Sequence, residues 1–378
     1  MKKIYSILSS FLLTIATTSL ALIVFSNCSN NTEKVEIPVT ENTIYWDCTN
    51  IGNEELKLSS IFKEYSLLAL EEKDEALVGQ VSKMVLHDSL LFVSDNNVLD
   101  KIFVFNNTSG KFLHSIGKIG QGPGEYYSLN DFSIDSENEK LYLLCNMENI
   151  YSYSLDGTFL EAKKIPFYAS CMEYQNDMFI FRCDSRSSHH LIITDNQFNV
   201  VAKHLDNELY KENDRMQVHH FQKREDGVLF HRFLDNNIYK FDKDGNKYIA
   251  YQLDFGKDAI DMAEISSYTD GEVKNTLKEG IFYKYFTETD NYAFLVFFKE
   301  AIPHISFYDK LHKKSITCKF EDITNDLFNG EFPVLEYEAA PNGFVGLLSL
   351  DAVERLKSEG VLNDNFSTDA NYVFLKFN

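Results

Sequence analysis

Short apolar runs recur along this chain after small polar turns, and this repeat limits the possible folds more than any other feature. Six runs begin at residues 90, 141, 178, 228, 293 and 344, so successive starts lie 51, 37, 50, 65 and 51 residues apart. Each run is long enough for one strand, and the turns before the runs consist mainly of Asn, Asp, Ser and Gly, which suit tight hairpins. A second turn follows each of the first five runs, at 107–110, 156–157, 195–199, 242–245 and 309–313. Two hairpins in each repeat predict four strands in each repeat.

Four-stranded units that recur about every 40 to 50 residues are typical of propeller blades. The sequence therefore predicts an all-β fold, a six-bladed β-propeller of four-stranded antiparallel blades. Weakly helical patterns predict short helical insertions near 258–279 and 352–360. Only three strands of the sixth repeat fit before residue 378, so we expect a strand near 64–71 to complete that blade and close the ring.

The N-terminal segment predicts export. Lys2 and Lys3 precede an uncharged, mostly apolar stretch that ends at Phe25, as in a signal peptide. The residues before Cys28, VFSN, resemble a bacterial lipobox, so we expect Cys28 to carry the lipid. A retained membrane helix is the alternative, because about 20 apolar residues can span a bilayer. The expected organisation is a lipoprotein signal peptide at 1–27, a polar tether at 28–36 and a single propeller domain at 37–378. The expected location is the bacterial cell envelope, with the lipid anchored in the outer membrane.

The charge of the chain narrows the choice of partner. With 57 Asp and Glu against 36 Lys and Arg, the net charge is -21. A protein that neutralises nucleic-acid phosphates needs a basic face, so nucleic acid is excluded as a partner. We expect contact with a membrane only through the lipid anchor.

Five cysteines remain when Cys28 is set aside, and an odd number argues against a full disulfide framework. Cys171 and Cys183 lie symmetrically about a probable hairpin turn at 176–177. They could pair across two strands, or they could be two small buried apolar side chains.

A glycine-rich stretch carries a family resemblance. Residues 116–126 (IGKIGQGPGEY) and 131–135 (DFSID) resemble the NHL-type repeat of six-bladed propellers. Together with DNNIYKF at 235–241, LDFG at 253–256 and LKLSSIF at 56–62, the GQGPGE turn resembles the six-bladed propeller lipoproteins of the Bacteroidetes. The resemblance implies an exported, lipid-anchored propeller and brings no catalytic residues with it. A strand follows the turn where a phosphate loop needs a helix, so we interpret the turn as structural, formed by Gly120, Gly122, Pro123 and Gly124.

Polar residues follow the second strand of each repeat, and they are the candidate ligand-binding residues: Asp95, Asn146, Arg182, Asp235, Lys299 and Asp351. Equivalent loops of a propeller lie at equal radius, so these residues should share one face with the connections between blades, which carry Gln121 and Glu125. Such a ring predicts a polar ligand, namely a glycan, a peptide or an envelope protein. The alternative is that each side chain caps its own turn.

Nothing in the sequence forms a recognisable catalytic constellation. There is no G-x-S-x-G elbow and no Cys/His run at zinc spacing. We therefore predict a non-catalytic binding or scaffold protein without a cofactor. The alternative is a divalent-cation-dependent hydrolase or lyase, similar to propeller lactonases, with calcium held at the axis by carboxylate oxygens.

Overall fold

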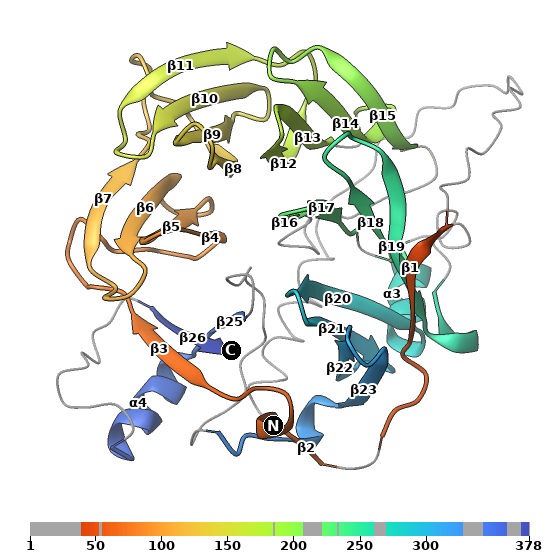
Figure 1. Cartoon of the computed structure of the whole chain (residues 1–378). Coiled ribbons are helices and arrows are strands. Elements are labelled where there is room, and N and C mark those ends of the chain that lie inside the picture. Colours follow the sequence, from red (N-terminus) through yellow and green to blue (C-terminus); the bar gives the residue numbers. More distant parts are fainter. Residues whose placement is uncertain are drawn as a thin grey trace, which may run out of the picture.

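The protein is a six-bladed β-propeller, as the sequence predicts (Figure 1). The computed structural model describes residues 39–52, 55–183, 186–206, 221–232, 234–260, 270–327, 343–360 and 372–377. Five blades are antiparallel meanders that run outward from the axis in chain order. Blade 1 contains β4 (Lys83–His87), β5 (Leu90–Asp95), β6 (Lys101–Asn106) and β7 (Phe112–Ile116). Blade 2 contains β8 (Leu129–Asp135), β9 (Lys140–Cys145), β10 (Asn149–Ser154) and β11 (Phe159–Lys164).

The next three blades repeat this arrangement. Blade 3 contains β12 (Ala169–Gln175), β13 (Met178–Cys183), β14 (His189–Asp195) and β15 (Val200–Asp206). Blade 4 contains β16 (Phe221–Arg224), β17 (Gly227–Phe230), β18 (Asn237–Phe241) and β19 (Lys247–Asp254). Blade 5 contains β20 (Ile281–Glu288), β21 (Tyr292–Lys299), β22 (Ile302–Asp309) and β23 (Lys314–Lys319).

The apolar runs become strands that are buried on both faces. In β5, Phe92 packs into the core shared with blade 2, whereas its neighbours Leu91 and Val93 pack into the core shared with blade 6. Successive side chains of a strand point to opposite faces, and each blade lies between two others. Both faces are therefore covered, which explains why these strands are continuous apolar runs and do not alternate with polar residues.

Blade 6 joins the two ends of the described chain. Its strands are β25 (Phe344–Leu347), β26 (Val373–Phe377) and β3 (Tyr65–Ala69), in that order. β3, which falls within the 64–71 segment expected to complete this blade, pairs antiparallel with β26 and brings Leu67 opposite Leu375. The remaining strand of this blade, expected next to β25 on the side of the axis, falls on residues 328–342, which lie outside the described residues.

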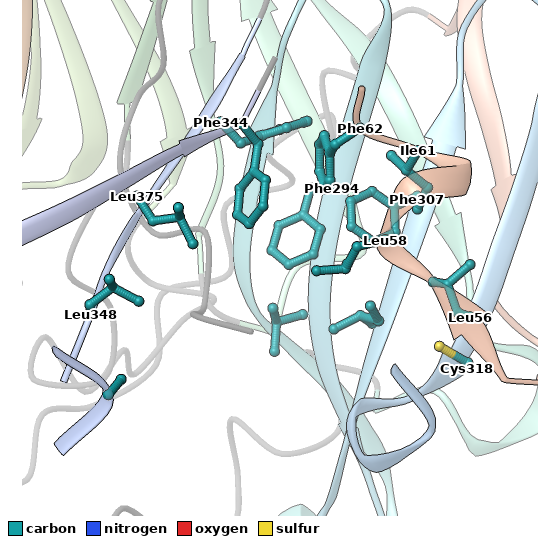
Figure 2. Packing of buried hydrophobic residues seen from close by; sticks show 14 of the residues in the cluster. Leu56, Leu58, Ile61, Phe62, Phe294, Phe307, Cys318, Phe344, Leu348 and Leu375 are labelled. Carbon is teal, nitrogen blue, oxygen red and sulfur yellow. The ribbon is translucent and has the colours of Figure 1, made fainter. Parts of the chain in front are cut away.

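The residues before β3 form a belt around blades 4, 5 and 6 that the sequence does not predict. We call β1 (Val39–Asp47), β2 (Leu56–Lys57) and η2 (Leu58–Ser60) the N-terminal belt. β1 pairs in parallel with β19 as a fifth strand of blade 4, and β2 pairs with β24 (Ile323–Thr324). Just after the belt, Phe62 packs between the cores of blades 5 and 6 (Figure 2), and its ring stacks on Phe377 with 4.6 Å between centroids.

Helical segments are short and few in the described part of the chain. They are α3 (Asp270–Glu279), α4 (Leu350–Ser358), η5 (Gly256–Asp258) and η6 (Phe320–Asp322), besides η2. α3 and α4 confirm the two expected insertions. No helix within the described ranges has the length and apolar character needed to cross a membrane. Cys171 and Cys183 are both free thiols, since Cys183 lies opposite Ala169 and Cys171 lies opposite Arg182.

Candidate functional site

The two faces of the propeller differ in what they carry. The turn face is the face with the hairpin turns between the first and second strands of blades 1 to 5, at 88–89, 136–139, 176–177, 225–226 and 289–291. The connection face carries the turns between second and third strands and the links between blades. Because β4, β8, β12, β16 and β20 are the innermost strands, their ends surround the axis (Figure 1).

A cavity of about 440 Å³ opens at the axis on the turn face. We call it the axial cavity. Five blades contribute to its wall, which contains Val85, Leu86, His87, Asp88, Asn107, Ile134, Ser136, Glu173, Gln175, Lys223, Arg224, Glu225 and Asp290. Four of these side chains are acidic and two are basic, so the wall carries a net negative charge with neutral histidine.

A buried ionic network lies at the axis beside this cavity. The Lys83 ammonium of β4 lies 3.2 Å from the Asp131 carboxylate of β8 and 3.3 Å from the Glu173 carboxylate of β12. Asp131 also accepts hydrogen bonds from the backbone N–H groups of Phe132 and Met172, both at 2.8 Å. Burial raises the pKa of Asp131, although the Lys83 ammonium acts in the opposite direction. The network thus links three blades through charges that are largely removed from water.

Other inner-strand side chains reach the backbone of a neighbouring or facing blade. Lys223 Nζ donates to the Ile134 carbonyl at 2.8 Å, and Gln175 donates to the Arg224 carbonyl at 2.6 Å. The Arg224 guanidinium contacts the carboxylate of Glu288 at 3.6 Å and that of Asp290. Both basic groups of the cavity wall are therefore already bound to acceptors of the protein.

One set of side chains on the turn face could hold a metal ion, considering only the described residues. A nitrogen of His87 and carboxylate oxygens of Asp88 and Glu139 all lie within 4.8 Å of one another. His87 Nε2 is 3.2 Å from a Glu139 oxygen. An imidazole with two carboxylates suits zinc better than calcium, which prefers oxygen ligands alone.

The candidate residues that follow the second strands lie elsewhere. None of the eight expected ligand-binding residues, Asp95, Asn146, Arg182, Asp235, Lys299, Asp351, Gln121 and Glu125, belongs to the wall of the axial cavity. The turns between second and third strands lie one strand outward from the axis and on the connection face. Asp351 lies in the first turn of α4, which is part of the connection between β25 and β26.

Several of these residues bind their own turn or a nearby loop. Asp95 is fully buried, and its carboxylate accepts hydrogen bonds from the backbone N–H groups of Gly79, Gln80, Asn97, Val98 and Leu99. The amide oxygen of Asn146 accepts from the N–H groups of Tyr127 at 3.1 Å and Ser128 at 3.0 Å. These contacts are those expected of turn caps.

The remaining members have individual partners. Asp235 accepts from Arg232 Nε at 2.8 Å and from the Tyr239 hydroxyl at 2.7 Å. Arg182 is 1% exposed and donates to Ser170 Oγ at 2.7 Å. Lys299 Nζ lies 4.0 Å from the carboxylate of Asp258.

The glycine-rich turn folds around Glu125. The Glu125 carboxylate accepts from the Gly122 N–H at 2.8 Å and pairs with Lys118 at 2.6 Å, and this Lys118 contact lowers the pKa of Glu125. A Cβ at Gly120 would lie 2.0 Å from a Glu125 oxygen, and Gly124 has a φ of +75°. The positive φ favours glycine at position 124, whereas a side chain at position 120 would displace the Glu125 carboxylate. Gln121 is exposed beside them.

A second hollow of about 420 Å³ lies on the connection face between blades 2 and 3. Its lining includes Glu148, Lys164, Phe167, Tyr168 and Arg186. The Arg186 guanidinium lies 4.0 Å from the centre of the Tyr168 ring, and Lys164 pairs with Glu148 at 3.0 Å. The charged groups of this hollow are therefore engaged with neighbours in the same wall.

The sequence alone did not identify the wall of the axial cavity. The acidic turns at 88–89, 225–226 and 289–291 are visible in the sequence, but their composition predicts only turn formation. The signal that could have found them is position: in a propeller the innermost strand is the first of each repeat, so the turn that follows it surrounds the axis.

Comparisons with known proteins support the architecture. A family described as "Domain of unknown function (DUF4934)" matches residues 37–376. The crystal structure of a candidate exported protein from Bacteroides fragilis NCTC 9343 is 21% identical, covers 89% of this chain and 99% of its own, and superposes with a TM-score of 0.72. A member of the DUF4221 family from Bacteroides vulgatus ATCC 8482 is 11% identical, with coverage of 84% and 97% and a TM-score of 0.52. No curated protein matches the chain. At these identities the two structures support the fold alone.

Proposed function

We propose that this chain, which belongs to the DUF4934 family, is an exported, lipid-anchored propeller that binds a polar ligand in its axial cavity and catalyses no reaction. The ligand classes are those that the sequence suggests, a glycan, a peptide or an envelope protein. Export is supported by the signal-like N-terminus and by the resemblance in fold to a candidate exported protein of Bacteroides fragilis.

The observation that carries the proposal is the composition of the cavity wall. Five blades place charged, amide and hydroxyl side chains around one opening of about 440 Å³, which falls within the range of about 300–1,000 Å³ typical of ligand sites. Convergent polar groups of this kind favour a ligand rich in hydrogen-bonding groups over a lipid. The acidic wall also disfavours nucleic acid.

The proposal of a non-catalytic role is supported by how the charged groups of the inner strands are used. Lys83 pairs with both Asp131 and Glu173, and Arg224 is held by Glu288 and Asp290. A general acid or base must reach the proton that it transfers, within about 2.6–3.2 Å or through one water. Groups held in this way stabilise the inner strands and leave recognition to the cavity rim.

The test compares the two faces by blocking each in turn. Ser136 is exposed at the rim of the axial cavity, so Ser136→Trp should fill the opening and abolish retention on a glycan and peptide array. The matched control is Gln121→Trp, which adds the same ring to an exposed position of the connection face. Loss of binding in the control alone would assign the site to the connection face. Unchanged binding in both variants, or no binding by the unmodified protein, would contradict the proposed function.

A further inference from the structure

We propose that the group recognised by the axial cavity is an organic cation, a protonated amine or a guanidinium. This inference deepens the proposed function and rests on it. The chemistry is shared by the Lys and Arg side chains of a basic peptide and by free polyamines.

The first argument is the composition of the turns on the turn face, three of whose acidic residues, Asp88, Glu225 and Asp290, line the axial cavity. The five described turns between first and second strands contain seven acidic residues and no Lys or Arg: Asp88, Glu137, Glu139, Asp177, Glu225, Asp226 and Asp290. Tight turns need Asn, Asp, Ser or Gly for their geometry, but Glu has no such role. The three glutamates in these turns are therefore not explained by turn formation.

The second argument is how the charges of the wall are balanced. The two cations, Lys223 and Arg224, are bound to the Ile134 carbonyl and to the carboxylates of Glu288 and Asp290. Within the described residues, the carboxylates of Asp88 and Glu225 have no hydrogen-bond or ion-pair partner, and both side chains are exposed. The cavity wall thus carries two unpaired carboxylates, whereas its Lys223 ammonium is hydrogen-bonded to a backbone carbonyl and its Arg224 guanidinium is paired with carboxylates.

The third argument is the closeness of like charges. Carboxylate oxygens of Asp88 in blade 1 and Glu139 in blade 2 lie within 4.8 Å of each other. Like charges this close repel each other, although Glu139 lies outside the cavity wall and its carboxylate also contacts His87 Nε2 at 3.2 Å. A cationic group between them removes this repulsion, so its binding is favoured over that of a neutral ligand.

Long-range electrostatics act in the same direction. The net charge of -21 attracts cations from solution, and a cleft lined by one sign of charge concentrates the opposite ion. This contribution is screened at high ionic strength, where the Debye length falls to about 3 Å at 1 M salt. The affinity for a cationic ligand should therefore decrease with added salt.

The experiment measures calorimetric binding of four probes to the full-length protein: a capped hexalysine peptide, a capped hexaglutamate peptide, spermidine and calcium chloride. We expect hexalysine to bind at low salt and hexaglutamate not to bind. The rim variant Asp88→Asn with Glu225→Gln should lose about tenfold in hexalysine affinity, as expected for a lost charge-assisted contact. The control Glu161→Gln with Glu321→Gln removes the same charge at exposed positions far from the axis and should retain full affinity.

The outcomes distinguish two claims: that the axial cavity is the binding site, and that its ligand is an organic cation. Spermidine that binds as tightly as hexalysine identifies a small polyamine as the source of the cation, and weaker spermidine binding identifies a basic peptide. Binding of hexaglutamate, equal hexalysine affinity in the rim variant, or binding of calcium alone overturns the organic cation. If hexalysine fails but Ser136→Trp still abolishes binding of an array ligand, the cavity stands and only the charge assignment is wrong.

Discussion

The ammonium group of Lys83 lies 3.3 Å from the carboxylate of Glu173, although the two residues belong to the first and third blades. Asp131 of the second blade contacts the same ammonium at 3.2 Å. A single cation thus contacts two carboxylates at the axis, beside the cavity.

Lys83→Met should destabilise the protein because it leaves Asp131 and Glu173 buried without a cation. Removing one partner of a buried ion pair typically costs about 3–5 kcal/mol. Urea unfolding of the variant measures this loss. Lys203→Met, which changes an exposed lysine of the outermost strand of blade 3, serves as the control. Equal unfolding free energies for the two variants would show that the axial network does not stabilise the fold.

Asp95→Ala should lose stability and keep ligand binding. Five backbone N–H groups lose their acceptor, and unsatisfied buried groups cost about 1–3 kcal/mol. Thermal melting and the array are measured on the same preparation, with Gln121→Ala as the exposed control. Weakened binding at unchanged melting temperature would identify Asp95 as a ligand-binding residue.

The sequence predicts the blades well because their signal is local. Runs such as 90–95 and 141–145 are apolar on both faces because each blade lies between two others. A run of this kind can be recognised from its own residues, without knowing which distant segment it pairs with. The N-terminal belt was missed because β1 follows no repeat. Its strand forms only because β19 offers an open edge, and the burial of Trp46 depends on contacts with Ser306 and Tyr308, about 260 residues away.

The candidate site was harder to predict for a physical reason. Propeller symmetry places equivalent loops at equal distances from the axis. It does not determine which set of loops is nearest the axis or where their side chains point. Asp95 turns into its own loop, whereas Glu225 remains at the rim of the axial cavity. Residue type alone does not distinguish a capping carboxylate from one that faces a ligand.

Stability should fall on acidification because of His204. Burial lowers the pKa of this imidazole to about 4 from its ordinary value of 6.5, with Lys247 and His189 adding to the effect. Between these two values the unfolded chain binds a proton that the folded protein does not, so stability present at neutral pH is lost as the pH falls from 6.5 towards 4. Melting temperatures across this range should vary less in His204→Gln than in the unmodified protein. The control His312→Gln, at an exposed position, should keep the original slope, and an unchanged slope in His204→Gln would contradict the assignment.

Cys28→Ala should abolish incorporation of radiolabelled palmitate and leave the precursor unprocessed. The reason is that the thiol of Cys28 is the expected acceptor of the lipid. The control is Cys48→Ala, since Cys48 is fully buried and burial raises the pKa of its thiol. Unchanged labelling of the Cys28 variant would show that the anchor lies elsewhere.

The position of a bound ligand tests the central claim most directly. A crystal structure of the protein with a ligand retained by the array should show that ligand in the axial cavity, in contact with Ser136 and the rim carboxylates Asp88 and Glu225. A ligand bound on the connection face, against Tyr168 and Arg186 or beside Gln121, would contradict the account.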